Sequence, residues 1–157
     1  MNSIELLLAN FNETRRRSLK LWHGLPEESY HWKPDAGAMS CLEMIRHVLE
    51  AEHLFYVIIK NGGNLGSYQS PWAGLPLLDL NSDLYFAEPF RQQLLTEIGC
   101  YSEADLTEIS IERTEKGQPP RRLGDYLNRM IYHESVHTGQ MMSYLRTYRA
   151  EIPVIWD

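Results

Sequence analysis

The sequence predicts an all-α protein, a four-helix bundle with one long inter-helix loop, formed as a single domain by residues 1–157. Apolar side chains recur at steps of three and four residues along four segments, which is the pattern of helices that bury one face. Helix start and stop signals bound these segments, and about 20 residues separate the second from the third. Four helices with one long crossover connection are typical of a bundle.

The first two helices have clear boundaries. The apolar pattern predicts a first helix over Ser3–His23, which Gly24 stops. The second helix begins with the clearest signal in the chain, because Ser40 at the N-cap and Glu43 three residues later form a capping box. It ends at the Asn-Gly-Gly sequence of residues 61–63.

The middle of the chain is less regular. Gly62–Asn81 is predicted to be a loop, and Trp72 within it is a candidate to close over a functional site. A third helix is predicted over Ser82–Ile98, with a start only near Glu88 as the alternative, because a proline at position 89 opposes helix interiors. The alternating residues Thr107–Arg113 predict a short extended segment.

Charge and composition exclude several classes of function. The net charge of −6 disfavours binding to a phosphate backbone, and the basic run at residues 15–17 is interpreted as the solvated face of a helix. No apolar run is long enough to cross a bilayer, and no secretory signal is visible. Cys41 and Cys100 form no disulfide framework, so we expect a cytoplasmic protein with reduced thiols.

The last predicted helix, Leu123–Tyr148, carries two histidines on its apolar face. His133 and His137 are four residues apart, so both imidazoles project from the same side. His47 lies on the apolar stripe of the second helix and can face them across the core. Three imidazoles suit a divalent metal ion such as zinc, nickel or iron, and they leave a coordination position for water or substrate.

Two other interpretations of these histidines stay open. A histidine on a core face is more often hydrogen-bonded to a carbonyl or hydroxyl group than to a metal. The sequence His-Glu-Ser-Val-His also fits the short motif of zinc peptidases, in which Glu134 would be the general base. His53 points about 120° away from His47 on an ideal helix, which indicates a surface or packing residue.

The motifs together resemble the DinB/YfiT-like family of small metal-binding four-helix bundles with up-down-down-up helix order. The resemblance covers most of the chain and rests on four segments: Trp32–Ser40, Met44–Val48, His133–Gln140 and Tyr144–Arg146. It implies that His47 is the first ligand and that His133 and His137 are the second and third. The chain departs from the family pattern at Val136, where a further histidine is common, and in the unmatched segment Gly62–Asn81.

The leading functional hypothesis is a metal-dependent thiol transferase or isomerase acting on small electrophiles, with a low-molecular-weight thiol or other small molecule as partner. Glu50 and Glu134 are the candidate catalytic residues, as outer partners of the ligands or proton acceptors, although solvated carboxylates are an equal alternative. Gln140, Tyr126 and Tyr144 lie near the ligand face. The rival hypotheses are a non-catalytic, stress-related metal-binding bundle and a zinc hydrolase. The resemblance also implies a homodimer.

Overall fold

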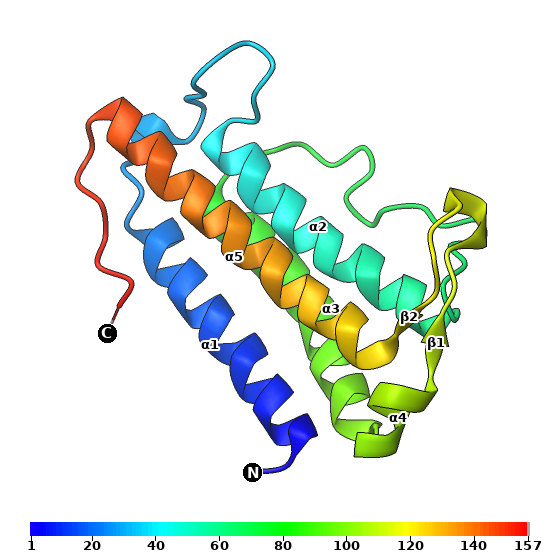
Figure 1. Cartoon of the computed structure of the whole chain (residues 1–157). Helices are drawn as coiled ribbons and strands as arrows, with labels where there is room; N and C mark the ends of the chain where they lie inside the picture. Colours follow the sequence, from blue (N-terminus) through cyan, green and yellow to red (C-terminus); the bar gives the residue numbers. More distant parts are fainter. Residues whose placement is uncertain (157) are drawn as a thin grey trace.

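The computed structural model describes residues 1–156, and within them four long helices form an up-down-down-up bundle (Figure 1). α1 and α5 run in one direction, while α2 and α3 run in the other. α1 packs against α3 and α5, and α2 packs against the same two helices. The predicted all-α fold is therefore confirmed. The bounds of the helices are α1 Ser3–His23, α2 Cys41–Lys60, α3 Leu80–Cys100, α4 Glu103–Glu108 and α5 Leu123–Tyr148.

Local capping fixes where the helices begin. The Ser40 hydroxyl accepts a hydrogen bond from the backbone N–H of Glu43 at 3.3 Å, and the Glu43 carboxylate accepts one from the backbone N–H of Ser40 at 2.6 Å. The capping box predicted for α2 is thus confirmed. A second capping box joins Asn2 and Glu5 at the start of α1. Each satisfies two backbone donors that an uncapped helix would leave without partners.

Two apolar clusters fill the space between the helices. One lies around Leu21, Leu42 and Leu145 toward the end of the bundle where α1 finishes, and the other lies around Leu94 and Leu127 toward its opposite end. Each of these leucines is at most 1% exposed. Full burial of one such side chain stabilises the fold by about 1.5–3 kcal/mol before entropy losses. The bundle therefore has a packed core on both sides of the histidines.

Residues 61–79 form the crossover between α2 and α3. The predicted loop is confirmed, but α3 begins at Leu80, two residues before the predicted Ser82. Asp79 is the reason, because its carboxylate accepts a hydrogen bond from the backbone N–H of Ser82 at 2.9 Å and so caps the helix. Trp72 is the buried anchor of the crossover, at 4% exposure.

Pro89 lies inside α3, so the alternative of a helix that starts only near Glu88 is wrong. Proline has no N–H, and the carbonyl of Tyr85 therefore lacks its usual partner one turn later. Pro89 is exposed and the Tyr85 side chain is 86% exposed, so this carbonyl lies on a face where water can reach it. The solvent-facing position explains why the helix continues through the proline.

The segment between α3 and α5 differs in part from the prediction. Only Ser110–Ile111 of the predicted extended segment is a strand, β1, and it pairs antiparallel with β2, Arg121–Arg122. The first residues of the predicted segment, Thr107 and Glu108, instead belong to α4, a short helix with its own capping box that was not predicted from the sequence. Gly63 packs so closely on this segment that an added Cβ would lie 2.1 Å from the Glu112 carbonyl oxygen.

The structure also tests two interpretations of composition. Within residues 1–156, no helix combines the length and apolarity that a bilayer crossing requires. Arg15, the first residue of the basic run, is only 6% exposed, so the interpretation of this run as a solvated face is wrong at that position. Its neighbour Arg16 is exposed, as interpreted. Cys41 and Cys100 are both free thiols.

Candidate metal centre

Three imidazole rings meet between α2 and α5. The Nε2 atom of His133 lies 3.2 Å from Nε2 of His47 and 3.2 Å from Nε2 of His137. One ligand atom from each ring lies within 4.8 Å of the other two. Zinc–nitrogen bonds of about 2.0–2.1 Å at tetrahedral angles place two ligand nitrogens about 3.3 Å apart. The structure therefore brings together the three histidines singled out from the sequence, at separations that one metal ion can bridge.

Helix geometry accounts for this convergence. His133 and His137 lie one turn apart on α5, with ring centroids 4.6 Å apart. His47 lies two turns into α2, whose start is fixed by the capping box at Ser40. Because α2 and α5 pack side by side, the third ring enters the space in front of the other two, 4.9 Å from the His137 ring.

The environment favours neutral imidazoles. Burial, together with positive charge on His137 and His47, lowers the pKa of His133 to about 4. Burial also lowers the pKa of His47, again with a contribution from His137. Neutral imidazoles present lone pairs, whereas three imidazolium ions at this distance would repel one another. Near pH 7 the donor set therefore suits a cation.

Gln140 contacts the cluster from the next turn of α5. Its amide oxygen lies 2.9 Å from Nδ1 of His137, on the side of the ring opposite to the atom that faces His133. We expected Gln140 near the ligand face, but not this contact. The spacing of three residues between His137 and Gln140 is the available signal in the sequence, because residues at i and i+3 meet on a helix surface.

Glu134, a candidate catalytic residue, lies in a buried ion pair with Arg15 of α1. The guanidinium donates from Nε to Oε1 at 2.8 Å and from Nη2 to Oε2 at 3.0 Å, so both carboxylate oxygens are engaged. Burial by itself would raise the pKa of Glu134, but the charge and hydrogen bonds of Arg15 outweigh it and lower that pKa. Glu134 is therefore an ionised carboxylate and a weak base.

A second ion pair adjoins the first and ties four helices together. Glu52 of α2 accepts from Arg91 of α3 at 2.6 Å and from Arg15 at 3.2 Å. Arg91 also donates to the Phe11 carbonyl oxygen of α1 at 2.9 Å. The two arginines and two carboxylates balance in charge, as burial of such groups requires. Sequence reasoning missed this network because its members are far apart along the chain.

Glu50, the other candidate catalytic residue, is half-buried on α2 between two histidines. It lies one turn after His47 and one turn before His53, and its charge opposes the effect of burial on the pKa of both rings. His53 packs against Phe90 and its Nδ1 lies 3.1 Å from the Tyr68 hydroxyl, so it is a packing residue, in line with the prediction.

The space around the cluster is unequal on its two sides. On the inner side, a cavity of about 10 Å³ lined by His133, Glu134 and Glu52 has room for one water molecule. The Trp72 ring packs against Phe86 and Phe90, so it covers the α2–α3 face and is not the cover suggested for the metal site. The three half-buried rings are therefore accessible from the solvent side and not from the inner cavity.

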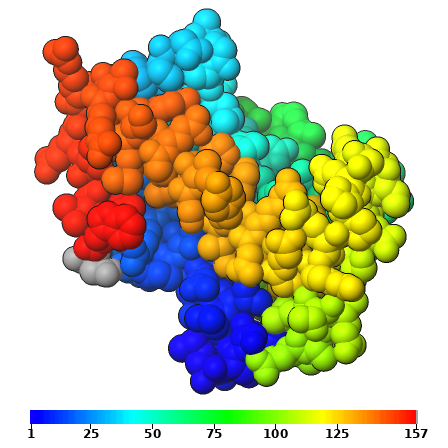
Figure 2. All heavy atoms as spheres, viewed as in Figure 1, coloured from blue at the N-terminus to red at the C-terminus, as the bar shows by residue number. Residues whose placement is uncertain are grey.

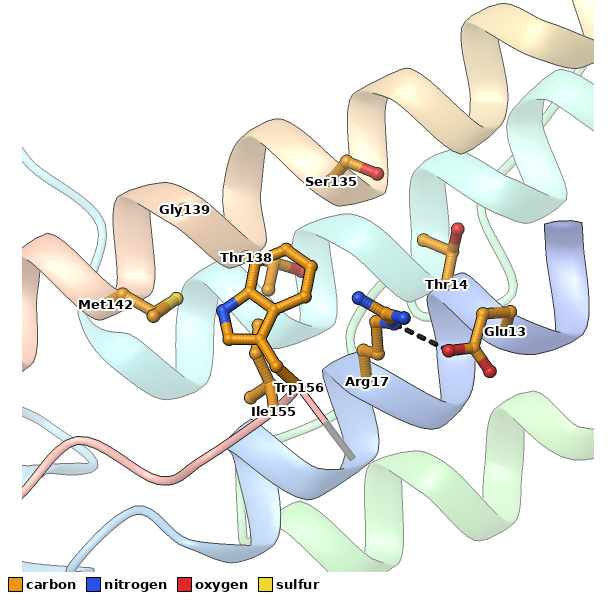
Figure 3. A pocket seen from close by; sticks show the side chains of 9 residues that line it. All are labelled: Glu13, Thr14, Arg17, Ser135, Thr138, Gly139, Met142, Ile155 and Trp156. Carbon is orange, nitrogen blue, oxygen red and sulfur yellow. Dashed lines mark hydrogen bonds and ion pairs between the residues drawn. The ribbon is translucent and has the colours of Figure 1, made fainter.

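A larger pocket of about 340 Å³ lies elsewhere, between α1, α5 and the C-terminal segment (Figure 3). Trp156 lies over its opening, and its ring is 4.6 Å from the Arg17 guanidinium carbon. The surface view shows this segment lying beside α1 and α5 on the face crossed by α5 (Figure 2). Among its lining residues are Ser135 and Gly139, which lie on α5 but not on the histidine face. The pocket is separate from the three histidines.

Comparison with known proteins gives consistent matches of family and fold. A family model of the DinB superfamily matches residues 10–141. The structure is similar to that of a DinB-like protein from Bacillus subtilis, with a TM-score of 0.68, 20% identity and coverage of 96% of this chain and 97% of that one. A DinB-like protein from Bacillus cereus gives a TM-score of 0.62 and 20% identity, with 95% of each chain covered. No curated protein gives a significant match.

Proposed function

The chain belongs to the DinB superfamily, and from this membership and its three convergent histidines we propose that it binds one divalent metal ion. The observation that carries the proposal is the separation of 3.2 Å between Nε2 of His133 and Nε2 of each of the other two rings. Zinc, nickel and iron are the candidate ions, since imidazole nitrogen suits all three.

Elemental analysis of untagged protein tests metal binding directly. The native protein is expected to hold close to one metal ion per chain, and His133→Ala is expected to hold almost none, because His133 lies between the other two nitrogens. His31→Ala is the matched control, since His31 is exposed in the connector before α2. Equal metal content in all three proteins, or none in the native protein, would contradict the proposal.

We further propose that the metal serves a transfer or isomerisation reaction between a low-molecular-weight thiol and a small electrophile. Three protein ligands leave a coordination position, and a bound divalent ion would act there as a Lewis acid that lowers the pKa of a thiol or water. The chain itself shapes the access, because the inner cavity of about 10 Å³ admits no substrate and the reactants must bind from the solvent side.

Glu50 is the proposed proton acceptor of this reaction. It is half-buried, one turn from His47, and close enough to affect the pKa of that ring. Glu134 is less suited to the task, since Arg15 engages both of its oxygens and lowers its pKa. The same ion pair disfavours the zinc-hydrolase alternative, which requires Glu134 as general base.

Thiol consumption by metal-loaded protein tests the reaction. A panel of small electrophiles is mixed with a low-molecular-weight thiol, and turnover is expected for the native protein but not for His47→Ala. Glu50→Gln is expected to keep the metal and lose most of the rate. If native protein and His47→Ala consume thiol equally slowly, a non-catalytic bundle is the better description. If Glu134→Gln abolishes hydrolysis with the metal retained, a zinc hydrolase is the better description. A homodimer and a cytoplasmic location stay predictions.

A further inference from the structure

The contact between Gln140 and His137 constrains the protonation of the imidazole. An amide oxygen can only accept a hydrogen bond, so with Oε1 of Gln140 at 2.9 Å the Nδ1 atom of His137 must carry the hydrogen. A neutral imidazole has one N–H, so Nε2 then keeps its lone pair. That Nε2 atom is the one that faces His133 at 3.2 Å. The contact therefore selects the tautomer that a metal ligand needs.

Tyr144 lies one turn after Gln140 on α5, and the Gln140 side chain opposes the rise in the pKa of Tyr144 caused chiefly by burial. Tyr144 is itself held in place, because it is 7% exposed and its ring meets the edge of Trp32 at 5.7 Å. Gln140 therefore lies beside a side chain that is itself held in place.

The other two histidines have no comparable support. Within residues 1–156, the hydrogen-bond contacts of His47 and His133 are with rings of the cluster itself. His137 alone of the three has a described hydrogen-bond partner outside the cluster, Gln140, which is exposed on the surface of α5. One directed contact from outside the cluster therefore sets the orientation of one ring, and through the 3.2 Å contact it constrains the next.

We propose that Gln140 is a positioning residue of the metal centre, which holds His137 as the Nδ1–H tautomer with its Nε2 lone pair directed at the ion. This inference rests on the proposed metal-binding function. Outer partners of metal-bound histidines fix the tautomer and ring orientation, and their loss typically weakens metal affinity by about 10- to 100-fold.

The test compares variants at two exposed helical glutamines. Gln140→Met keeps the length and helix propensity of the side chain but removes the amide, and Gln140→Glu keeps an oxygen acceptor for Nδ1–H. Gln93→Met, on the exposed face of α3, is the matched control. Zinc affinity is measured by competition with a chromophoric chelator. Gln140→Met is expected to bind zinc about 10- to 100-fold more weakly, whereas Gln140→Glu and Gln93→Met stay within about threefold of the native protein.

Nitrogen-15 NMR of the metal-free proteins gives a readout that a merely structural role would not move. His137 is expected to be in the Nδ1–H form in the native protein and in Gln140→Glu, and in a mixture of both tautomers in Gln140→Met. Circular dichroism identifies any variant that does not fold, and Gln140→Ala then takes the place of Gln140→Met.

The outcomes separate this inference from the function on which it rests. Native protein that binds no zinc overturns both. Native protein that binds zinc, with Gln140→Met equal to it in affinity and in tautomer, overturns the role of Gln140 alone. Weakened binding that Gln140→Glu fails to restore also overturns it, because the acceptor would then not be the property that matters.

Discussion

The buried pair of Arg15 and Glu134 allows a quantitative prediction about stability. Arg15→Met leaves a carboxylate that is about 9% exposed without its main partner, and Glu134→Leu leaves a buried guanidinium whose remaining ion pair is with Glu52 at 3.2 Å. Removal of one partner from a buried ion pair is strongly destabilising, by about 3–5 kcal/mol. We expect about 3 kcal/mol for Glu134→Leu, the lower end, because Glu52 still compensates Arg15.

The double variant Arg15→Met/Glu134→Leu should be more stable than the sum of the single effects predicts. It removes one positive and one negative charge, and it leaves the pair of Arg91 and Glu52 intact at 2.6 Å. Replacement of a buried ion pair by apolar side chains is often close to neutral. The coupling energy between the two positions is therefore expected to be about 2 kcal/mol or more.

Urea denaturation of the metal-free proteins measures these energies. For a chain of this size, a loss of about 3 kcal/mol corresponds to a fall in Tm of about 6–12 °C. The exposed pair of Glu13 and Arg16, with both side chains 42% exposed, is the matched control, and Arg16→Met is expected to cost about 1 kcal/mol or less. The reasoning would be refuted if Arg15→Met cost no more than Arg16→Met, or if the cycle gave no coupling.

Three further predictions concern acid stability, a glycine and a helix cap. The pKa of His133 is about 4 in the folded protein, below its ordinary value, so the contribution of neutral His133 to the stability of the metal-free protein should be complete above about pH 6.5 and be lost as the pH falls toward 4. Urea midpoints measured at a series of pH values should show this dependence of stability on pH, and His133→Asn should reduce it. Gly63→Ala should destabilise the protein by about 2 kcal/mol or more, because the new Cβ would meet the backbone of Glu112 and the backbone φ of Gly63 is +120°. Thermal melts compare it with Gly99→Ala, where nothing lies within 4 Å of the added Cβ, and equal Tm values for the two variants would contradict this prediction. Ser40→Ala should cost about 1 kcal/mol by loss of the N-cap of α2, measured by urea denaturation, and an unchanged midpoint would exclude the cap as a stabilising contact.

The bounds of the long helices were accessible from the sequence because they depend on neighbours along the chain. α1 and α5 have the predicted limits, and the cap of α2 has the predicted residues, since apolar periodicity and capping act over a few residues. Pro89 shows the limit of such rules, because its effect depends on whether the face that it interrupts is buried.

In the candidate site too, some features follow from neighbours along the chain and others depend on the tertiary structure. The pairing of His133 with His137 follows from helix geometry alone, and the place of His47 follows once α2 and α5 are neighbours. The partners of Glu134 and Gln140 depend on tertiary structure in different degrees. Gln140 reaches His137 within one helix, whereas Arg15 meets Glu134 across 119 positions of sequence.

By itself the sequence determined the four long helices, the face on which each histidine lies and the donor chemistry of the cluster. Only the tertiary structure decided that Arg15 is buried and paired, that Trp72 covers the α2–α3 face, and that the inner side of the cluster has room for one water molecule. The physical reason is the separation along the chain of the residues that each interaction joins. Backbone hydrogen bonds and side-chain periodicity are settled between residues a few positions apart, while burial and ion pairing depend on which helices become neighbours.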